Sequence, residues 1–151
     1  MLNLSLNKEV RRLYQPKKPE IKLWLQKSLI KAYQNIHIEI HIISLKNSQK
    51  LNLEYRGKDY PTNVISLEYK DSRDNFNMLY GELFLCDDVI VKESNVQQKS
   101  IIEHYAHMVI HGLLHLQGLD HQNETDATKM ENIEIKIMHE LGFNNPYDVE
   151  E

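Results

Sequence analysis

Four segments of the chain have the apolar and polar spacing of β-strands: residues 2–6, 35–43, 64–69 and 79–86. The clearest is "NIHIEIHII", in which isoleucine alternates with polar residues. Because successive side chains of a strand point to opposite faces, these isoleucines face the core and the polar residues face away from it. We therefore interpret His37 and His41 as solvated strand positions rather than metal ligands.

Apolar residues spaced three to four positions apart predict further helical segments. They cover residues 19–33, 47–55, 87–94, 100–117 and 126–142. Asp87 and Thr125 are placed to cap the third and the fifth of these helices, and Gly118 is placed to end the fourth. The polar residues 70–78 predict a loop. Strands and helices follow no regular βαβ rhythm, so we expect one α+β domain over residues 1–151, with a small mixed sheet of about four strands.

The composition is typical of a soluble globular protein and excludes several classes. A chain of 151 residues can bury a core without disulfides, and its single cysteine, Cys86, is expected in that core. The net charge of −4 argues against a basic protein that coats DNA. No apolar stretch approaches the roughly 20 residues that span a bilayer, and the N-terminus does not resemble a signal peptide. We therefore expect a cytoplasmic protein with no membrane partner.

The segment "HGLLHLQGLDH" places three histidines in an otherwise apolar stretch. Residues four apart share one face of a helix, so His111 and His115 can present ring nitrogens to the same ion. Gly118 can adopt the left-handed conformation that ends a helix, which lets His121 turn back towards that ion. The spacing therefore predicts one metal ion per chain, held by His111, His115 and His121 on a central helix and the turn after it.

The ligand set indicates which metal and which kind of site to expect. Three imidazoles without nearby thiolates favour zinc, although nickel or copper could also bind such a set. Three protein ligands leave a fourth tetrahedral position open, as in catalytic zinc sites. His107 lies on the same helix face but about 12 Å from His115, so it cannot share the ion. We interpret His107 as core packing or a proton shuttle, and His104 and His139 as surface or core residues.

The same histidine spacing occurs in the metzincin peptidases, where a glutamate directly after the first histidine acts as the general base. Gly112 occupies that position here, so the usual route to peptide hydrolysis is missing. Glycine inside a helix costs about 1 kcal/mol relative to alanine, and its presence needs a reason. We predict that Gly112 leaves room for a phosphodiester at the open face of the metal. The alternative is that it permits close packing of a neighbouring element.

Two further segments extend the pattern beyond the histidines. With "LNLEYRGKDYPTNVIS" and "GEL" at residues 81–83, the chain resembles the YbeY family of bacterial endoribonucleases. The similarity covers most of residues 50–148, including "MENIEIKIMHELGF" and "NNPYD". Glu82 stands where the family often has an aspartate, and Leu119 where it often has an aromatic residue. Neither departure removes a predicted ligand.

The resemblance implies a zinc-dependent endoribonuclease that is specific for single-stranded RNA. It implies a role in ribosomal RNA maturation, particularly at the 3′ end of the small-subunit RNA, and in ribosome quality control, with RNA and the ribosome as partners. It also implies that His111, His115 and His121 hold the zinc and that Arg56 contacts the substrate phosphate. A guanidinium suits a phosphate, although the residues alone would favour a surface salt bridge for Arg56.

Asp120 is the second residue that we place in the chemistry, either orienting a ligand imidazole or serving as the missing base. Two other functions stay open. One is a ribosome-assembly binding factor whose metal is mainly structural, with a fourth ligand from Glu82 or Asp120. The other is a metal hydrolase acting on a different phosphoester or amide, because ligands do not reveal the substrate.

Basic residues also gather near the N-terminus. They could form a flank that follows an RNA backbone beside stacking aromatic residues, although such clusters are more often solvated faces. The residues are Arg11, Arg12, Lys17, Lys18, Lys22 and Lys27.

Overall fold

The strands form one mixed sheet with the order β1-β2-β4-β3. The computed structural model describes residues 2–69 and 77–148. Its strands are β1 (Leu2–Lys8), β2 (Asn35–Ile43), β3 (Val64–Glu68) and β4 (Met78–Cys86). β1, β2 and β4 are parallel, whereas β3 is antiparallel to β4. The predicted α+β fold with a small mixed sheet is therefore confirmed.

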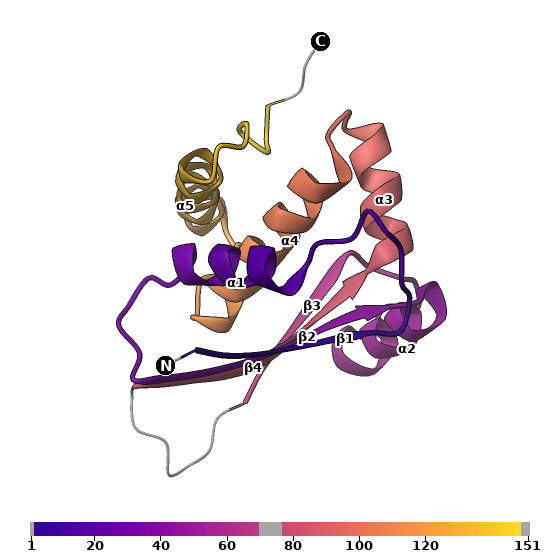
Figure 1. Ribbon diagram of the computed structural model, residues 1–151, viewed down its shortest axis with the longest axis horizontal. Helices are drawn as coiled ribbons and strands as arrows, with labels where there is room; N and C mark the ends of the chain where they lie inside the picture. The colour runs from indigo at the N-terminus through magenta and orange to yellow at the C-terminus, as the bar shows by residue number, and fades with distance from the viewer. Residues whose placement is uncertain (1, 70–76, 149–151) are drawn as a thin grey trace.

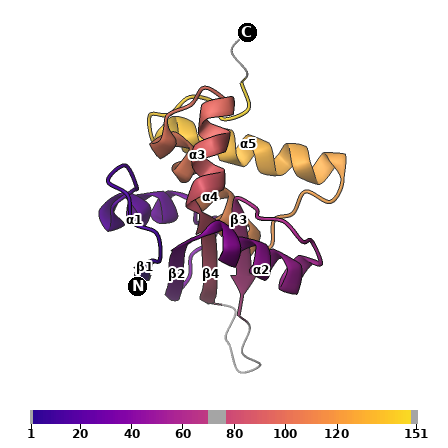
Figure 2. The same cartoon turned by 90° about the vertical axis from the view of Figure 1, so that its right-hand side faces the viewer.

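Helix α4 lies at the centre of the helical layer. The helices of the described chain are α1 (Lys18–Lys27), α2 (Leu45–Arg56), α3 (Asp87–Val96), α4 (Ile101–Leu116) and α5 (Glu124–Glu140). α4 contacts β3, β4 and the helices α1, α3 and α5. Figure 1 shows α1, α4 and α5 on one side of the sheet, and Figure 2 shows the strands side by side beneath them. No described helix has both the length and the apolar character needed to cross a membrane.

The two faces of the sheet carry different side chains. On the face towards α4, which we call the inner face, Ile38, Ile40 and Leu83 are at most 1% exposed. The opposite face, which we call the outer face, carries the alternate residues of each strand. Helix α2 covers part of the outer face, where it borders a cavity together with His41 and Phe84. The period-two pattern thus separates an apolar face from a polar and aromatic one.

Helix α1 ends at Lys27, which is shorter than the amphipathic pattern to residue 33 predicts. The buried side chain of Gln117 provides the reason. Its Nε2 atom donates to the Ser28 carbonyl at 2.8 Å, and its Oε1 atom accepts from the Ile30 N–H at 2.8 Å. A backbone bound in this way cannot continue the helical ladder. The amide therefore ties the chain leaving α1 to the end of α4.

The two predicted N-caps are wrong. Asp87 is already the first residue of α3, and its buried carboxylate accepts hydrogen bonds from the Tyr14 and Tyr105 hydroxyls instead of capping the helix. In α5 the cap is Asn123 rather than Thr125, with its Oδ1 atom accepting from the Asp126 N–H at 2.9 Å. The Asp87 carboxylate is used by donors from other parts of the chain, and Asn123 is a better capping residue than Thr125.

The remaining local expectations have mixed outcomes. Cys86 is buried, as expected of a core residue. The loop predicted over residues 70–78 lies outside the described residues except for its last two positions, and Met78 already belongs to β4. His41 is not simply solvated, because its Nε2 atom lies 2.7 Å from a carboxylate oxygen of Glu82 and its ring stacks on Phe84.

Candidate metal centre

Three histidines converge at the C-terminal end of α4. His111 and His115 occupy successive turns of that helix, and the chain then reverses through Gly118, which has a φ of +96°. A positive φ is readily available to glycine alone, so the turn that returns His121 depends on this residue. The ligand atoms of His111, His115 and His121 all lie within 4.8 Å of one another.

The chemistry of these three side chains fits a transition metal. The Nε2 atoms of His111 and His115 are 3.1 Å apart, and the His121 ring centre lies 5.0 Å from that of His115. Burial, together with the neighbouring His111 and His121, lowers the pKa of His115 to about 4. A neutral imidazole keeps the lone pair that a metal requires. The group can therefore hold a metal ion, and its donors are of the type that zinc accepts.

Glu134 of α5 orients the first histidine, and sequence reasoning missed it. The His111 Nδ1–H donates to Glu134 Oε1 at 2.5 Å, which leaves His111 Nε2 facing the other two rings. Burial would raise the pKa of the Glu134 carboxyl, but the nearby His107 and the hydrogen bond from His111 outweigh it and lower that pKa to about 2. Glu134 has no exposed surface. Its position four residues after Met130, on the apolar face of α5, is the clue that the sequence offered.

A second layer of polar contacts holds Glu134 itself. The Tyr147 hydroxyl donates to Glu134 Oε2, and His107 Nε2 lies 3.6 Å from Oε1 and 3.3 Å from the Tyr147 hydroxyl. His107 is therefore a buried polar residue that supports the carboxylate, not only apolar packing. His104 is also buried, and its Nε2 atom lies 2.8 Å from Glu93 Oε1. His104 thus pairs with a different carboxylate, away from the three converging histidines.

An open cleft of about 580 Å³ leads to the three histidines. Arg56, at the end of α2, lines it together with Lys58. One Arg56 Nη2–H donates to the Val64 carbonyl at 3.2 Å, which holds the guanidinium beside strand β3. No carboxylate of the described chain forms a salt bridge with Arg56, so the surface ion pair suggested by the residues alone is not seen there. The cleft thus places a cation beside the histidines.

Asp120 lines the same cleft, one residue before His121. Its Oδ1 atom accepts from the His121 N–H at 2.7 Å, and the side chain is exposed. The bond is to the backbone of the neighbouring residue rather than to a ligand imidazole. Glu131 of α5 is another carboxylate of the cleft, and the sequence offered no sign of it.

The comparisons with known proteins agree with this geometry. A family model described as "Endoribonuclease YbeY" matches residues 6–142. This chain belongs to the YbeY family of endoribonucleases. Two relatives named "Endoribonuclease YbeY" are similar to it. The one from Colwellia psychrerythraea is 40% identical over 136 residues, covering 87% of this chain and 88% of the relative. The one from a Janthinobacterium species is 39% identical over 130 residues, covering 86% and 83%.

A solved structure supports the fold. The solution structure of a Thermotoga maritima protein matches with a TM-score of 0.52 and covers 97% of this chain and 99% of its own. The two sequences are 18% identical, so the match speaks for the fold alone. The family model and the two relatives, rather than this structure, confirm the resemblance to the YbeY family that the histidine motif and the "YRGKDYPTN" segment indicated.

The expectation that Gly112 leaves room for substrate is wrong. Gly112 is buried on the inner side of α4, where an added Cβ would lie 2.8 Å from Leu83 Cδ2 and 3.1 Å from Ser66 Oγ. The Ser66 hydroxyl donates to the Gly112 carbonyl at 3.1 Å. Position 112 therefore serves close packing of α4 on the sheet, which is the alternative reading. In this YbeY-family chain no side chain larger than hydrogen fits there without displacement.

The outer face holds another set of metal-capable donors. Atoms of Glu39, His41 and Glu82 lie within 4.8 Å of one another. Glu82 is therefore on the opposite face of the sheet from the α4 histidines and cannot be their fourth ligand. Its oxygens are already used, one by His41 and the other by the Tyr69 hydroxyl.

Proposed function

We propose that this chain is a zinc-dependent endoribonuclease that cuts single-stranded RNA in the cytoplasm. Its proposed task is maturation of ribosomal RNA, at the 3′ end of the small-subunit RNA, together with ribosome quality control. Residues 1–151 would act as one catalytic domain with one zinc ion, and RNA rather than DNA would be the substrate. The observation that carries this proposal is the shared cleft of the three histidines and Arg56 in a member of the YbeY family.

Five polar residues of the cleft have distinct parts in the proposed reaction. His111, His115 and His121 would hold the metal, which when bound supplies Lewis-acid activation of water and of a phosphoryl oxygen. The Arg56 guanidinium would bind the substrate phosphate through its planar N–H groups. The Oδ1 atom of Asp120 accepts the His121 N–H, so its Oδ2 atom is the one to receive a proton from the attacking water.

The alternative of a binding factor with a structural metal needs a fourth protein ligand. Glu82 is on the outer face, and Asp120 is not among the donors that cluster with the histidines. A group with three histidines leaves a coordination position for solvent or substrate, which favours catalysis. The cleft leading to that position supports the same reading.

Cleavage of defined oligonucleotides tests the proposal. We expect the purified protein to cut labelled single-stranded RNA, including one that spans the 3′ end of precursor small-subunit RNA, and to leave duplex RNA and single-stranded DNA intact. A chelator should stop the reaction, and zinc should restore it. A folded, zinc-loaded protein that cuts none of these RNAs would show that the proposal is wrong.

Arg56→Glu separates the phosphate contact from the metal. The change reverses a charge in the cleft without touching a histidine, so cleavage should fall while metal content and folding stay unchanged. Lys92→Glu on α3 is the control, because Lys92 is exposed and lies outside the cleft. Equal cleavage by the Arg56→Glu and Lys92→Glu proteins would remove Arg56 from the substrate site.

A further inference from the structure

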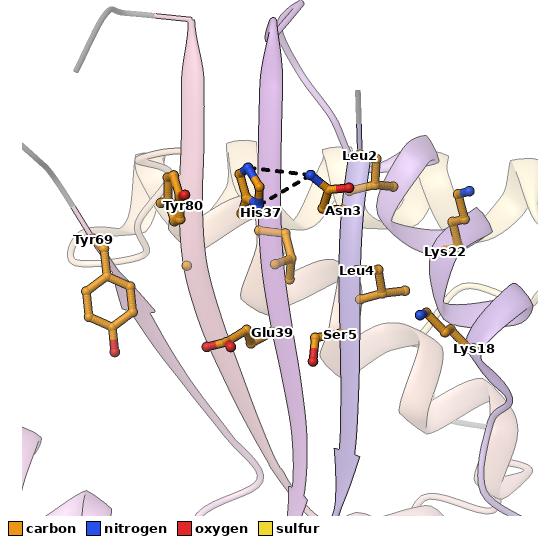
Figure 3. Close-up of a pocket in the computed structure, with 12 residues that line it drawn as sticks. Leu2, Asn3, Leu4, Ser5, Lys18, Lys22, His37, Glu39, Tyr69 and Tyr80 are labelled. Carbon is orange, nitrogen blue, oxygen red and sulfur yellow. Dashed lines mark hydrogen bonds between the residues drawn. The ribbon is translucent and has the colours of Figure 1, made fainter.

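A cavity of about 640 Å³ extends from the outer face of the sheet past the edge strand β1 to helix α1, away from the three histidines. Figure 3 shows the residues that line it, with Tyr69 on one side and the lysines of α1 on the other. The residues that matter here are Asn3, His37, Tyr69, Tyr80, Lys18 and Lys22. Nothing in the proposed reaction uses any of them.

Aromatic rings form the floor of this cavity. The His37 and Tyr80 rings stack with their centres 4.6 Å apart and their planes 15° apart. Tyr80 is 38% exposed and Tyr69 is 48% exposed. Asn3 lies beside His37 in the strand register, and its Nδ2 atom is 3.4 Å from His37 Nδ1. Because the His37 and Tyr80 rings cover each other on one side, the ring face that Tyr80 leaves free is the one on the side of Tyr69, and a partly exposed ring face suits the stacking of an unpaired base.

Charge divides the cavity into two zones. Lys18 and Lys22 are exposed and lie one helical turn apart on α1, along one rim. Glu39 is exposed on the floor, and no ion pair of Glu39 is present in the described part of the chain. Phosphates are attracted to the lysine rim and repelled from Glu39. A carboxylate can instead accept hydrogen bonds from the amino group of a base.

Strand β3 connects this cavity to the cleft with the histidines. Its first residue, Val64, accepts a hydrogen bond from Arg56, and Tyr69 follows its last residue. Five residues of strand span about 16 Å. Tyr55 directly precedes Arg56 and lies close enough to Tyr69 to contribute to its raised pKa, which the hydrogen bond to Glu82 mainly causes. The exposed Tyr55 and Tyr69 therefore lie between Arg56 and the outer-face cavity.

We propose that the outer-face cavity is a second contact for the single-stranded RNA substrate. A base stacks on the face of Tyr80 that His37 leaves free, and phosphates bind Lys18 and Lys22. The inference rests on the proposed function and adds how the enzyme holds RNA beyond the cleaved bond. It also gives a reason for the proposed preference for single strands, because a base that is paired and stacked inside a duplex cannot stack on Tyr80.

Binding to a series of single-stranded RNAs of increasing length tests this contact. We expect the affinity of the parent protein to rise once the RNA is long enough to reach the outer face. Tyr80→Ala should lower the affinity for long RNAs about 5- to 150-fold, the range known for one stacked base. The affinity for short RNAs should stay unchanged. Tyr80→Phe keeps the ring and should retain the affinity. Fluorescence anisotropy at fixed salt with a nuclease-resistant RNA measures all of these.

The lysine rim has its own test. Changing Lys18 and Lys22 together to glutamate should lower the affinity for long RNAs and reduce the salt dependence of binding. Lys92→Glu should change neither quantity. If folded Tyr80→Ala binds every length as the parent does, the inference is wrong. The inference is also wrong if the outer-face variants bind RNA as the parent does and lose only the binding of another protein. Because binding is measured without cleavage, a parent protein that binds long RNA on this face but cuts none would instead overturn the proposed function.

Discussion

The two faces of the sheet show two ways in which the same strands serve a site. On the inner face, glycines let α4 approach the sheet until its side chains interlock. An added Cβ at Gly81 would lie 2.7 Å from Leu116 Cδ1, and one at Gly112 would lie 2.8 Å from Leu83 Cδ2. On the outer face the rings and carboxylates are partly exposed. Close packing on the inner face therefore fixes the position of α4 and its histidines, whereas the outer face leaves side chains open to solvent.

The largest effect is expected on the α4 side of the sheet, when one of the three converging histidines is removed. His111→Ala should eliminate stoichiometric zinc and reduce cleavage to the level of the metal-free protein, because two imidazoles no longer form a three-ligand site. Elemental analysis and the RNA cleavage assay measure both. His139→Ala, an exposed histidine of α5, is the matched control. Full zinc occupancy in the His111→Ala protein would contradict the site.

Changing Glu134 to glutamine sharpens the distinction between a ligand and the residue behind it. Glutamine keeps the shape and can still accept from His111 Nδ1, but it loses the charge that supports the imidazole. We expect metal affinity or activity to fall about 10- to 100-fold. Competition with a chromogenic chelator measures the affinity, and Glu140→Gln on the exposed side of α5 is the control. An unchanged metal affinity would mean that Glu134 only fills the core.

Alanine at the two inner-face glycines tests how tightly α4 is packed. Gly81→Ala should lower the free energy of unfolding by about 1–3 kcal/mol, because its Cβ meets both Leu116 methyl groups and the Leu67 carbonyl oxygen, which belongs to the backbone. Gly112→Ala should cost less, since alanine gains about 1 kcal/mol over glycine inside a helix. Urea unfolding compares them. The close-packing account is wrong if both variants unfold at the parent concentration of urea.

The smallest expected effect is on the outer face. Glu39 and Glu82 are Cα partners on neighbouring strands, and like charges in such pairs are destabilising. Glu39→Gln should therefore stabilise the protein by about 0.2–1 kcal/mol, measured by urea unfolding in the presence of a chelator. A destabilised variant would indicate that Glu39 has a favourable partner within the protein that outweighs its repulsion from Glu82.

Much of the fold followed from local patterns. The alternation in residues 35–43 and the helical spacing around residue 110 predicted β2 and α4, because each pattern places a long apolar surface on one side. The extent of α1 could not be predicted, since its end depends on Gln117, distant in sequence. The same holds for Asp87, whose carboxylate is used by Tyr14 and Tyr105 rather than by its own helix.

The candidate site also has residues that local patterns predict and residues that only distant contacts bring together. The three histidines could be predicted because two share one helix face and a glycine turn returns the third. Glu134 could not, since only the packing of α5 against α4 brings it to His111. The role of Gly112 was predicted wrongly for a related reason. A sequence shows that a side chain is missing but not whether a substrate or a neighbouring strand occupies the space.

Because His121 lies outside α4, metal binding there would be linked to local opening of the chain. Residues 120–126 are all exposed, so little apolar burial holds the segment between α4 and α5 in place. An ion shared by His121 and two residues of a buried helix would hold this segment in place. Release of the ion would expose the amides of this segment to solvent, while those of α4 stay protected. Hydrogen exchange in the segment should then follow the free metal concentration, and the lifetime of the closed turn should follow the residence time of the ion.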